Sequence, residues 1–271
     1  MPKQGRAQPV ILPTQSVGTH LPLARGGYFH ISSRPWHTLL FLLPFIIFYE
    51  LGSTGIIGGG VSETLEAQDM LVRFFDLFGV LGLHLPAIVL VVTLLIQHLL
   101  SKSRWTVYPG VLFAMIAESA FLTGPLVVLA IVLSSLAPAV ITGGAAQSIE
   151  PTVIPSTFEG MYLAVGAGIY EEMLFRLVLI TLLHFVVTDV LGFKHKTGLV
   201  IAVVLSALAF AWHHDAVTAT GVLNWRLGIF YTLAGGYFGV LFLARGFGIA
   251  VGAHLMYDLL VLVVMPGIQA E

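Results

Sequence analysis

The chain has 271 residues, of which 57% are hydrophobic and 10% are charged, and its formal net charge is −2. A typical soluble domain carries about 25% charged residues, so this composition excludes an ordinary soluble domain, and the charge gives no sign of a nucleic-acid partner. The absence of cysteine excludes disulfides, cysteine nucleophiles and thiolate metal sites. Together with a mean hydropathy of +0.95, these values predict an integral, multi-pass membrane protein.

The hydropathy pattern predicts an all-α bundle of about seven membrane spans, or eight if one further segment is re-entrant or broken. Residues 1–35 are basic and contain no acidic residue, which predicts a flexible N-terminal tail. Residues 36–157 are expected to hold the first helices and loops, and residues 158–264 a second group of helices. The expected spans are 36–51, 78–100, 111–136, 158–187, 199–214, 227–244 and 247–264.

The loop 52–76 has a short amphipathic pattern made by Leu65, Met70, Leu71, Phe74 and Phe75. This pattern predicts a helix lying on the membrane surface. A pore or a substrate cap is the alternative interpretation of the same segment.

The distribution of basic residues predicts the orientation of the chain. The basic tail, the loop with Lys102 and Arg104, the loop with Lys194 and Lys196, and Arg245 all fall on one side of the predicted membrane. Cytoplasmic loops are enriched in lysine and arginine, so we expect the N-terminus inside and the C-terminus outside. The host membrane is expected to be the cell (plasma) membrane.

The segment 166–177 places two glutamates and an arginine within a stretch apolar enough for lipid. Intramembrane charges are costly and usually mark function. Glu172 and Arg176 have the i, i+4 spacing of a helical ion pair, whereas Glu171 points about 100° away from Glu172. We therefore expect Glu172 to be held by Arg176 and Glu171 to be available for chemistry.

Two later helices carry comparable one-turn pairs, Phe210 with His214 and His254 with Asp258. Polar groups of a membrane bundle turn inward, so the three pairs are expected to meet at one interior site. A carboxylate, two imidazoles, an aspartate and a guanidinium suit general acid–base hydrolysis, with or without a metal.

Several polar residues have simpler interpretations. Glu118 is expected to join helices, and only one of the neighbours His213 and His214 can face the site. Asp215 is expected to cap its span.

With straight helices, Glu171, His214 and His254 would lie at different depths in the membrane. A shared site therefore requires that the fifth span continues past Asp215, that the fifth and seventh spans tilt strongly, or that the span boundaries differ from those given. We expect the Glu171 carboxylate and the rings of His214 and His254 to lie within about two hydrogen-bond lengths of a common point.

The three motifs, E-E-M-L-F-R at 171–176, F-A-W-H-H at 210–214 and H-L-M-Y-D at 254–258, match E-E-x-x-x-R, F-x-x-x-H and H-x-x-x-[N/D]. In this order they resemble the intramembrane proteases of the CAAX-prenyl-protease and bacteriocin-processing family, also called the Abi family. The resemblance covers residues 158–264. The family often has asparagine at the last position, where this chain has Asp258.

The resemblance implies roles for these residues. Glu171 would be the general base on water, and His214 would position that water. His254 would donate to the carbonyl or oxyanion, Asp258 would hold its tautomer, and Glu172 with Arg176 would support the site. If the reaction uses zinc, Glu171, His214 and His254 would bind it. We favour the metal-free mechanism, because the chain lacks the H-E-x-x-H motif.

The expected activity is that of an intramembrane endopeptidase on a membrane-associated protein or peptide. Other intramembrane proteases fit less well, because the H-E-x-x-H and G-x-G-D motifs do not occur in the chain and G-x-S occurs only at 60–62, in the loop 52–76 outside the expected spans. A proton- or cation-coupled transporter is an alternative, although the polar residues crowd into one half of the sequence. A non-catalytic member that binds a peptide or gives immunity is another. The sequence does not indicate whether the substrate is prenylated.

Overall fold

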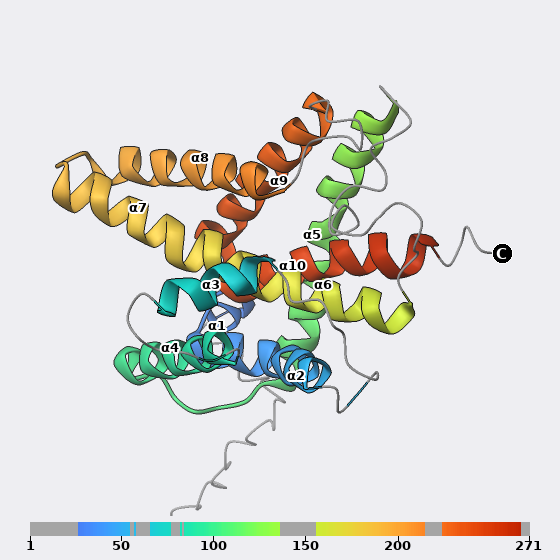
Figure 1. The fold of residues 1–271 in the computed structure, drawn as a ribbon. Helices are drawn as coiled ribbons and strands as arrows, with labels where there is room; N and C mark the ends of the chain where they lie inside the picture. The colour runs from blue at the N-terminus through green and yellow to red at the C-terminus, as the bar shows by residue number, and fades with distance from the viewer. Residues whose placement is uncertain are drawn as a thin grey trace, which may run out of the picture.

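The computed structural model describes residues 27–54, 66–76, 84–135, 156–214 and 224–266, together with Ile57 and Gly82. These residues form helices and no strand, which confirms the predicted all-α fold (Figure 1). The predictions made for most of the N-terminal tail, for the link 137–155 and for Asp215 lie outside the described residues.

The helices follow one another along the chain. Segments labelled η are π-helical turns that continue an α-helix. The elements are α1 (Tyr28–Ser32), α2 (Pro35–Ser53), α3 (Glu66–Asp76), α4 (Leu85–Ser101), α5 (Pro109–Ser135), α6 (Thr157–Glu172), η3 (Met173–Ile180), α7 (Thr181–Phe185), η4 (Val186–Val190), α8 (His195–His213), α9 (Trp225–Arg245), α10 (Phe247–Leu259) and η5 (Leu260–Val264).

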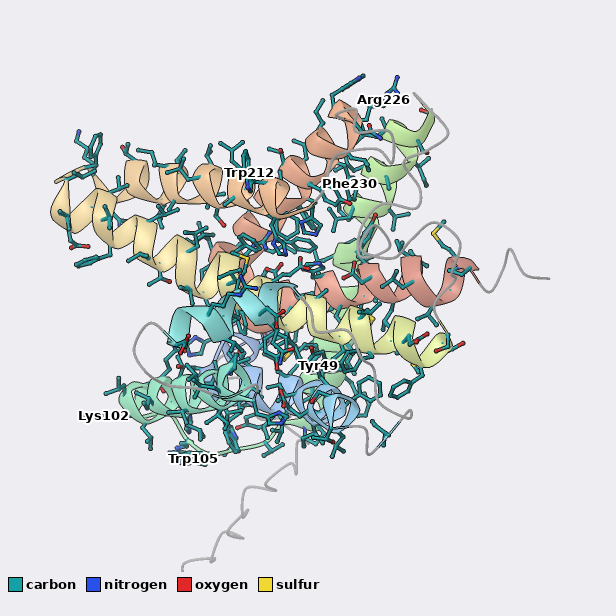
Figure 2. All side chains as sticks on the ribbon, viewed as in Figure 1. Tyr49, Lys102, Trp105, Trp212, Arg226 and Phe230 are labelled. Carbon is teal, nitrogen blue, oxygen red and sulfur yellow. The ribbon has the colours of Figure 1, made fainter. Side chains whose placement is uncertain are left out.

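Six helical segments of the described chain are long and apolar enough to cross a membrane, and α4 is a shorter apolar helix of 17 residues. A described helix lies in each of the seven predicted segments, and a multi-pass membrane protein is confirmed. In the second segment the described helix α4 starts at Leu85, with Pro86 in its first turn, where proline is favoured. Lys102 and Trp105 lie at the lower left of Figure 2 and Arg226 at the upper right, and the orientation of the chain in the membrane stays a prediction.

One uninterrupted helix runs from Thr157 to Val190 through α6, η3, α7 and η4. Its 34 residues would span about 51 Å, well beyond the roughly 30 Å of a hydrocarbon core. A capping box starts this helix, since Ser156 accepts from the Glu159 N–H and Glu159 accepts from the Ser156 N–H.

The long helix and α8 form an antiparallel hairpin that extends to one side of the bundle (Figure 1). Gly192, with φ +74°, lies in the tight turn between them, where a side chain would be strained. Glu171 lies 19 residues before Val190, and His214 lies 19 residues after His195. The hairpin therefore places Glu171 and His214 at the same level.

Of the three ways to bring Glu171 and His214 to one level, different span boundaries apply. The long helix continues past the predicted boundary at 187, and α8 begins before the predicted boundary at 199. Each predicted boundary was a few residues short, and this hid the register of the hairpin.

α10 is the central helix of the bundle and packs against α2, α5, α6 and α9. Its span is 72% buried, more than any other candidate span among the described residues. A Cβ built on Gly168 of α6 would lie 2.9 Å from Leu255 Cβ, so glycine allows α6 and α10 to approach closely. This approach sets the distance between the motifs on the two helices.

The predicted amphipathic helix in the loop 52–76 is present as α3. It packs against α4 and α6, and Ala67, Gln68 and Leu71 are buried. Tyr49 donates to Gln68 Oε1 over 2.5 Å and fastens α3 to α2. The membrane-surface position of α3 stays a prediction.

Candidate active site

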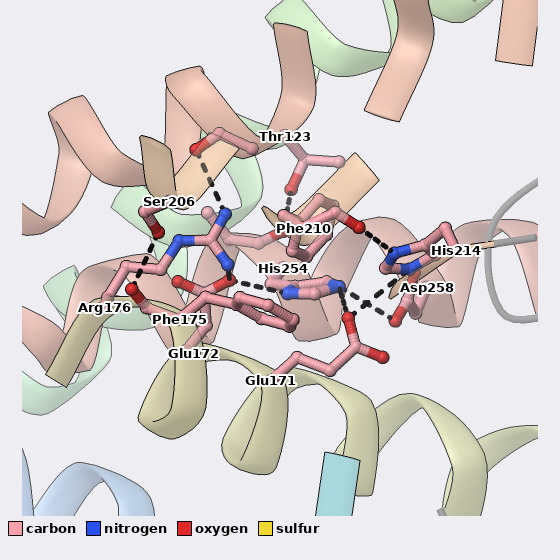
Figure 3. A network of polar contacts seen from close by, with 12 residues as sticks. Thr123, Glu171, Glu172, Phe175, Arg176, Ser206, Phe210, His214, His254 and Asp258 are labelled. Carbon is pink, nitrogen blue, oxygen red and sulfur yellow. Dashed lines mark hydrogen bonds and ion pairs between the residues drawn. The ribbon is translucent and has the colours of Figure 1, made fainter. Parts of the chain in front are cut away.

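The two adjacent glutamates lie at the end of α6, where the helix passes into the π-helical segment η3. Both are buried, Glu171 with 7% and Glu172 with 0% of its surface exposed. Figure 3 shows Glu172 next to Arg176 and Glu171 next to His214, with His254 between the two carboxylates. In the π-helical turn, the Phe175 carbonyl accepts a hydrogen bond from Ser206 Oγ over 2.7 Å. This hydrogen bond joins the turn to α8.

Glu172 is held by Arg176, one turn further along. Arg176 Nη1 lies 3.0 Å from Glu172 Oε1, and Arg176 Nη2 donates to the Gly235 carbonyl over 3.1 Å. The fully buried guanidinium also stacks over the Phe210 ring at 4.5 Å. Glu172 is therefore fixed between its own helix and the neighbouring ones.

His254 of α10 connects the two glutamates. Its Nδ1 lies 2.8 Å from Glu172 Oε1, and its ring stacks on Phe238 at 4.5 Å. The other ring nitrogen, Nε2, lies 3.4 Å from Asp258 Oδ2 and 3.8 Å from Glu171 Oε2. Glu172 thus contacts Nδ1, and Asp258, which was expected to hold the tautomer of the ring, lies on the Nε2 side.

His214 follows the last residue of α8. Its Nδ1 lies 2.9 Å from the Phe210 carbonyl, which can only accept, so Nδ1 carries the proton. The Nε2 atom lies 3.4 Å from Glu171 Oε2, and the ring stacks on Tyr231 at 4.4 Å. Between the neighbours His213 and His214, it is His214 that reaches Glu171. When the His214 ring is neutral, the lone pair of its Nε2 atom is directed toward Glu171.

The motif residues surround a cavity of about 20 Å³, which is room for one water molecule. Glu171 Oε2 and Asp258 Oδ2 belong to residues that line it, and neither atom makes a hydrogen bond among the described residues. The lining residues are Leu126, Glu171, Phe210, His214, Phe230, Tyr231, Ala234, Phe238, His254, Tyr257 and Asp258.

The sequence analysis missed the aromatic wall of this cavity. Tyr231 and Phe238 of α9 stack on the two histidines, and Tyr257 precedes Asp258 on α10. A signal for Phe238 existed, because Phe238 and His254 each lie eight residues from Gly246, the left-handed residue (φ +87°) between α9 and α10. Residues equally distant from a tight turn lie opposite each other in a helical hairpin.

Other polar residues lie outside the cavity. Glu118 of α5 binds Arg245 of α9 through two contacts of 2.5 and 2.8 Å, so the prediction that Glu118 joins helices is confirmed. Among the residues that the structure describes, no group of three or more histidine, aspartate and glutamate side chains is arranged to hold a metal ion. Zinc binding by Glu171, His214 and His254 therefore stays an untested expectation.

Fold and site together define a class: a multi-pass helical membrane protein with a buried, water-sized cavity lined by acid and base groups. Comparison with known families gives the next step. Residues 152–260 match the family model described as type II CAAX prenyl endopeptidase Rce1-like. This matched segment of the chain contains all three motifs. The resemblance to the CAAX-prenyl-protease and bacteriocin-processing family is thereby confirmed over residues 152–260. Neither the curated proteins nor the solved structures contain a match.

Proposed function

We propose that the protein is an intramembrane endopeptidase that hydrolyses a peptide bond of a membrane-associated protein or peptide, with Glu171 as the general base. One observation carries the proposal. Glu171 Oε2 lies 3.4 and 3.8 Å from the Nε2 atoms of His214 and His254, at a cavity with room for a water molecule. A carboxylate and two imidazoles around one water are what general-base hydrolysis needs.

In the proposed reaction, a water in the cavity donates one hydrogen bond to Glu171 Oε2. His214 Nε2 accepts a second one, because the Nδ1 proton of that ring is directed to Phe210. The water is then oriented with its oxygen toward the substrate carbonyl. As it attacks, its proton passes to Glu171, and a tetrahedral intermediate with a negative oxygen forms.

His254 is proposed to stabilise that oxygen. With both ring nitrogens protonated, Nδ1 donates to Glu172 and Nε2 donates into the cavity, where the oxyanion develops. Arg176 fixes Glu172, so the guanidinium acts on the chemistry by positioning His254. Asp258 lies one turn from His254 and orients the Nε2 side of the ring.

The substrate and the location belong to the same proposal. The family description names CAAX prenyl endopeptidases, so a prenylated C-terminal peptide is the first substrate to test. The apolar helices imply a lipid environment, and we propose the cell membrane as the site of action.

The proposal is tested with purified protein in liposomes and a fluorogenic farnesylated CAAX peptide, alongside a set of unprenylated transmembrane peptides. Glu171→Gln should abolish cleavage of whichever peptide the wild type cleaves, while substrate binding is retained. Glu159→Gln on the same helix is the matched control, since glutamine also completes a capping box, and it should cleave like the wild type. Binding without cleavage by the wild type would instead indicate a peptide-binding protein.

The metal-free form of the mechanism has its own test. We expect the metal content of the purified protein to be substoichiometric, and extended treatment with 1,10-phenanthroline to leave cleavage unchanged. Stoichiometric zinc, together with loss of activity on its removal and recovery on its return, would show that the reaction needs the metal.

A further inference from the structure

The far end of the helical hairpin carries two histidines that the proposed reaction does not use. His184 lies in α7, on the long helix, and His195 is the first residue of α8. His184 Nε2 lies 3.0 Å from His195 Nδ1, and the two rings meet edge to face with their centroids 4.7 Å apart. Glu171 lies 13 residues before His184 on the same long helix, so the pair is about 20 Å from the cavity.

The fold of the hairpin holds the two histidines opposite each other. Gly192 makes the tight turn, and the Phe193 N–H donates to the Val187 carbonyl over 3.1 Å. Beyond the turn, Gly198 packs so closely on the long helix that an added Cβ would lie 2.2 Å from Thr188 Oγ1. Both rings therefore project from helices whose spacing is fixed on either side of the pair.

Dissolved ions have access to this end of the hairpin. His195 is exposed and His184 is half-buried. The charged residues nearby in the sequence, Asp189, Lys194 and Lys196, are exposed as well. Because the long helix exceeds the thickness of a hydrocarbon core, we expect this charged end to face water.

Two imidazole nitrogens this close together can share one proton or bind one metal ion. Neutral imidazole is a good ligand for copper, nickel and zinc. With metal–nitrogen bonds of about 2.0–2.1 Å, two nitrogens 3.0 Å apart subtend about 90° at the metal. This angle suits square-planar or tetragonal Cu²⁺ and Ni²⁺, whereas tetrahedral Zn²⁺ needs nitrogens about 3.3 Å apart.

We propose that His184 Nε2 and His195 Nδ1 form a surface site for a divalent transition metal that bridges the two helices of the hairpin. Cu²⁺ is the preferred ion and Ni²⁺ the next, because affinity for nitrogen ligands is highest for copper and the angle disfavours zinc. Within the described part of the chain, no third histidine, aspartate or glutamate joins the pair as a ligand, so water fills the other positions. The proton between the two nitrogens leaves when the ion binds. The site lies outside the cavity and does not depend on the proposed peptidase activity.

The experiment uses the whole 271-residue chain in detergent, freed of metal with EDTA, dialysed, and titrated with CuCl₂, NiCl₂ or ZnCl₂ in separate runs. Calorimetry measures affinity, and electron paramagnetic resonance of the Cu²⁺ sample should show coupling to two nitrogens. His184→Ala and His195→Ala should each lower the Cu²⁺ affinity at least about 10-fold, because a single imidazole cannot chelate the ion. His30→Ala, which changes an exposed histidine of α1, is the matched control and should bind like the wild type.

The variants also locate the ion, because the cavity contains two further histidines, His214 and His254. If both His184→Ala and His195→Ala bind Cu²⁺ as tightly as the wild type, the ion lies elsewhere and the proposal is overturned. Wild-type binding at millimolar Cu²⁺ only, an adventitious ion, or tighter binding of Zn²⁺ than of Cu²⁺ would overturn it as well. Peptide cleavage by the metal-free variants should equal that of the metal-free wild type, which shows that they are folded.

Discussion

Two arginine–carboxylate pairs of this protein have the same chemistry and very different surroundings. Arg176 and Glu172 lie on one helix, are fully buried, and contact His254 of the active-site cavity. Arg245 and Glu118 join α9 to α5, with side chains 14% and 16% exposed, and also bind Tyr28 and Ser32 of α1. In the proposed mechanism the first pair orients His254, whereas the second pair joins α1 to α5 and α9. The comparison asks whether burial and the neighbouring partners, more than the pair itself, decide the role.

The largest difference is expected when each arginine is removed. Arg176→Met removes one partner of a fully buried ion pair and leaves Glu172 with His254, so it should cost about 3–5 kcal/mol of unfolding free energy and abolish cleavage. Arg245→Met leaves Glu118 with access to water and should cost about 1–2 kcal/mol. Unfolding by SDS in mixed micelles measures both. Equal losses would show that burial does not separate the two pairs.

The glutamates should differ in their effect on rate. Glu172→Gln removes the charge next to His254 Nδ1, and kcat is expected to fall by about 10²-fold. Glu118→Gln removes a charge far from the cavity and should leave kcat unchanged. The measurement is kcat for the cleaved peptide with protein shown to be folded. A drop of similar size in Glu118→Gln would contradict the assigned roles.

The close contact between α6 and α10 sets the distance from Glu172 to His254. Changing this contact therefore tests how the buried arginine–glutamate pair depends on helix packing. Gly168→Ala would place a methyl group 2.9 Å from Leu255 Cβ and should destabilise the protein by about 1–3 kcal/mol, with reduced cleavage. Gly228→Ala meets nothing within 4 Å in α9 and should be neutral or stabilising. Both are compared by thermal unfolding and by kcat. Unchanged stability of Gly168→Ala would show that the close approach is not needed.

The smallest effect is expected at Tyr28, which donates to Glu118 Oε2 at 2.5 Å. Burial and the bonded carboxylate raise the pKa of Tyr28, so its hydroxyl stays a donor at physiological pH. Tyr28→Phe should cost about 1 kcal/mol and leave kcat unchanged. Tyr108→Phe serves as a control for loss of a tyrosine hydroxyl in the same half of the protein. A reduced rate in Tyr28→Phe would give α1 a part in catalysis.

The same contrast shows what the sequence could predict. The pairs Glu172/Arg176 and His254/Asp258 were visible because four residues are one helical turn, and composition alone predicted a membrane bundle. The convergence of three helices followed from the cost of polar groups in lipid.

The remaining features depend on distances between helices. The contact of Glu172 with His254 Nδ1 requires the close packing of α6 on α10 at Gly168, which no local pattern encodes. The level of His214 depends on where the hairpin turns, and an error of a few residues in the boundaries concealed it. Arg245 was counted for topology only, because its partner Glu118 lies 127 residues away.

The most direct test of the central claim is cleavage of the peptide substrate in H₂¹⁸O by wild type and Glu171→Gln. If the buried residues activate a water in the cavity, the wild type should place one ¹⁸O in the new carboxyl group, as measured by mass spectrometry, and Glu171→Gln should form no product. Product without ¹⁸O, or labelled product formed by Glu171→Gln at the wild-type rate, would contradict it.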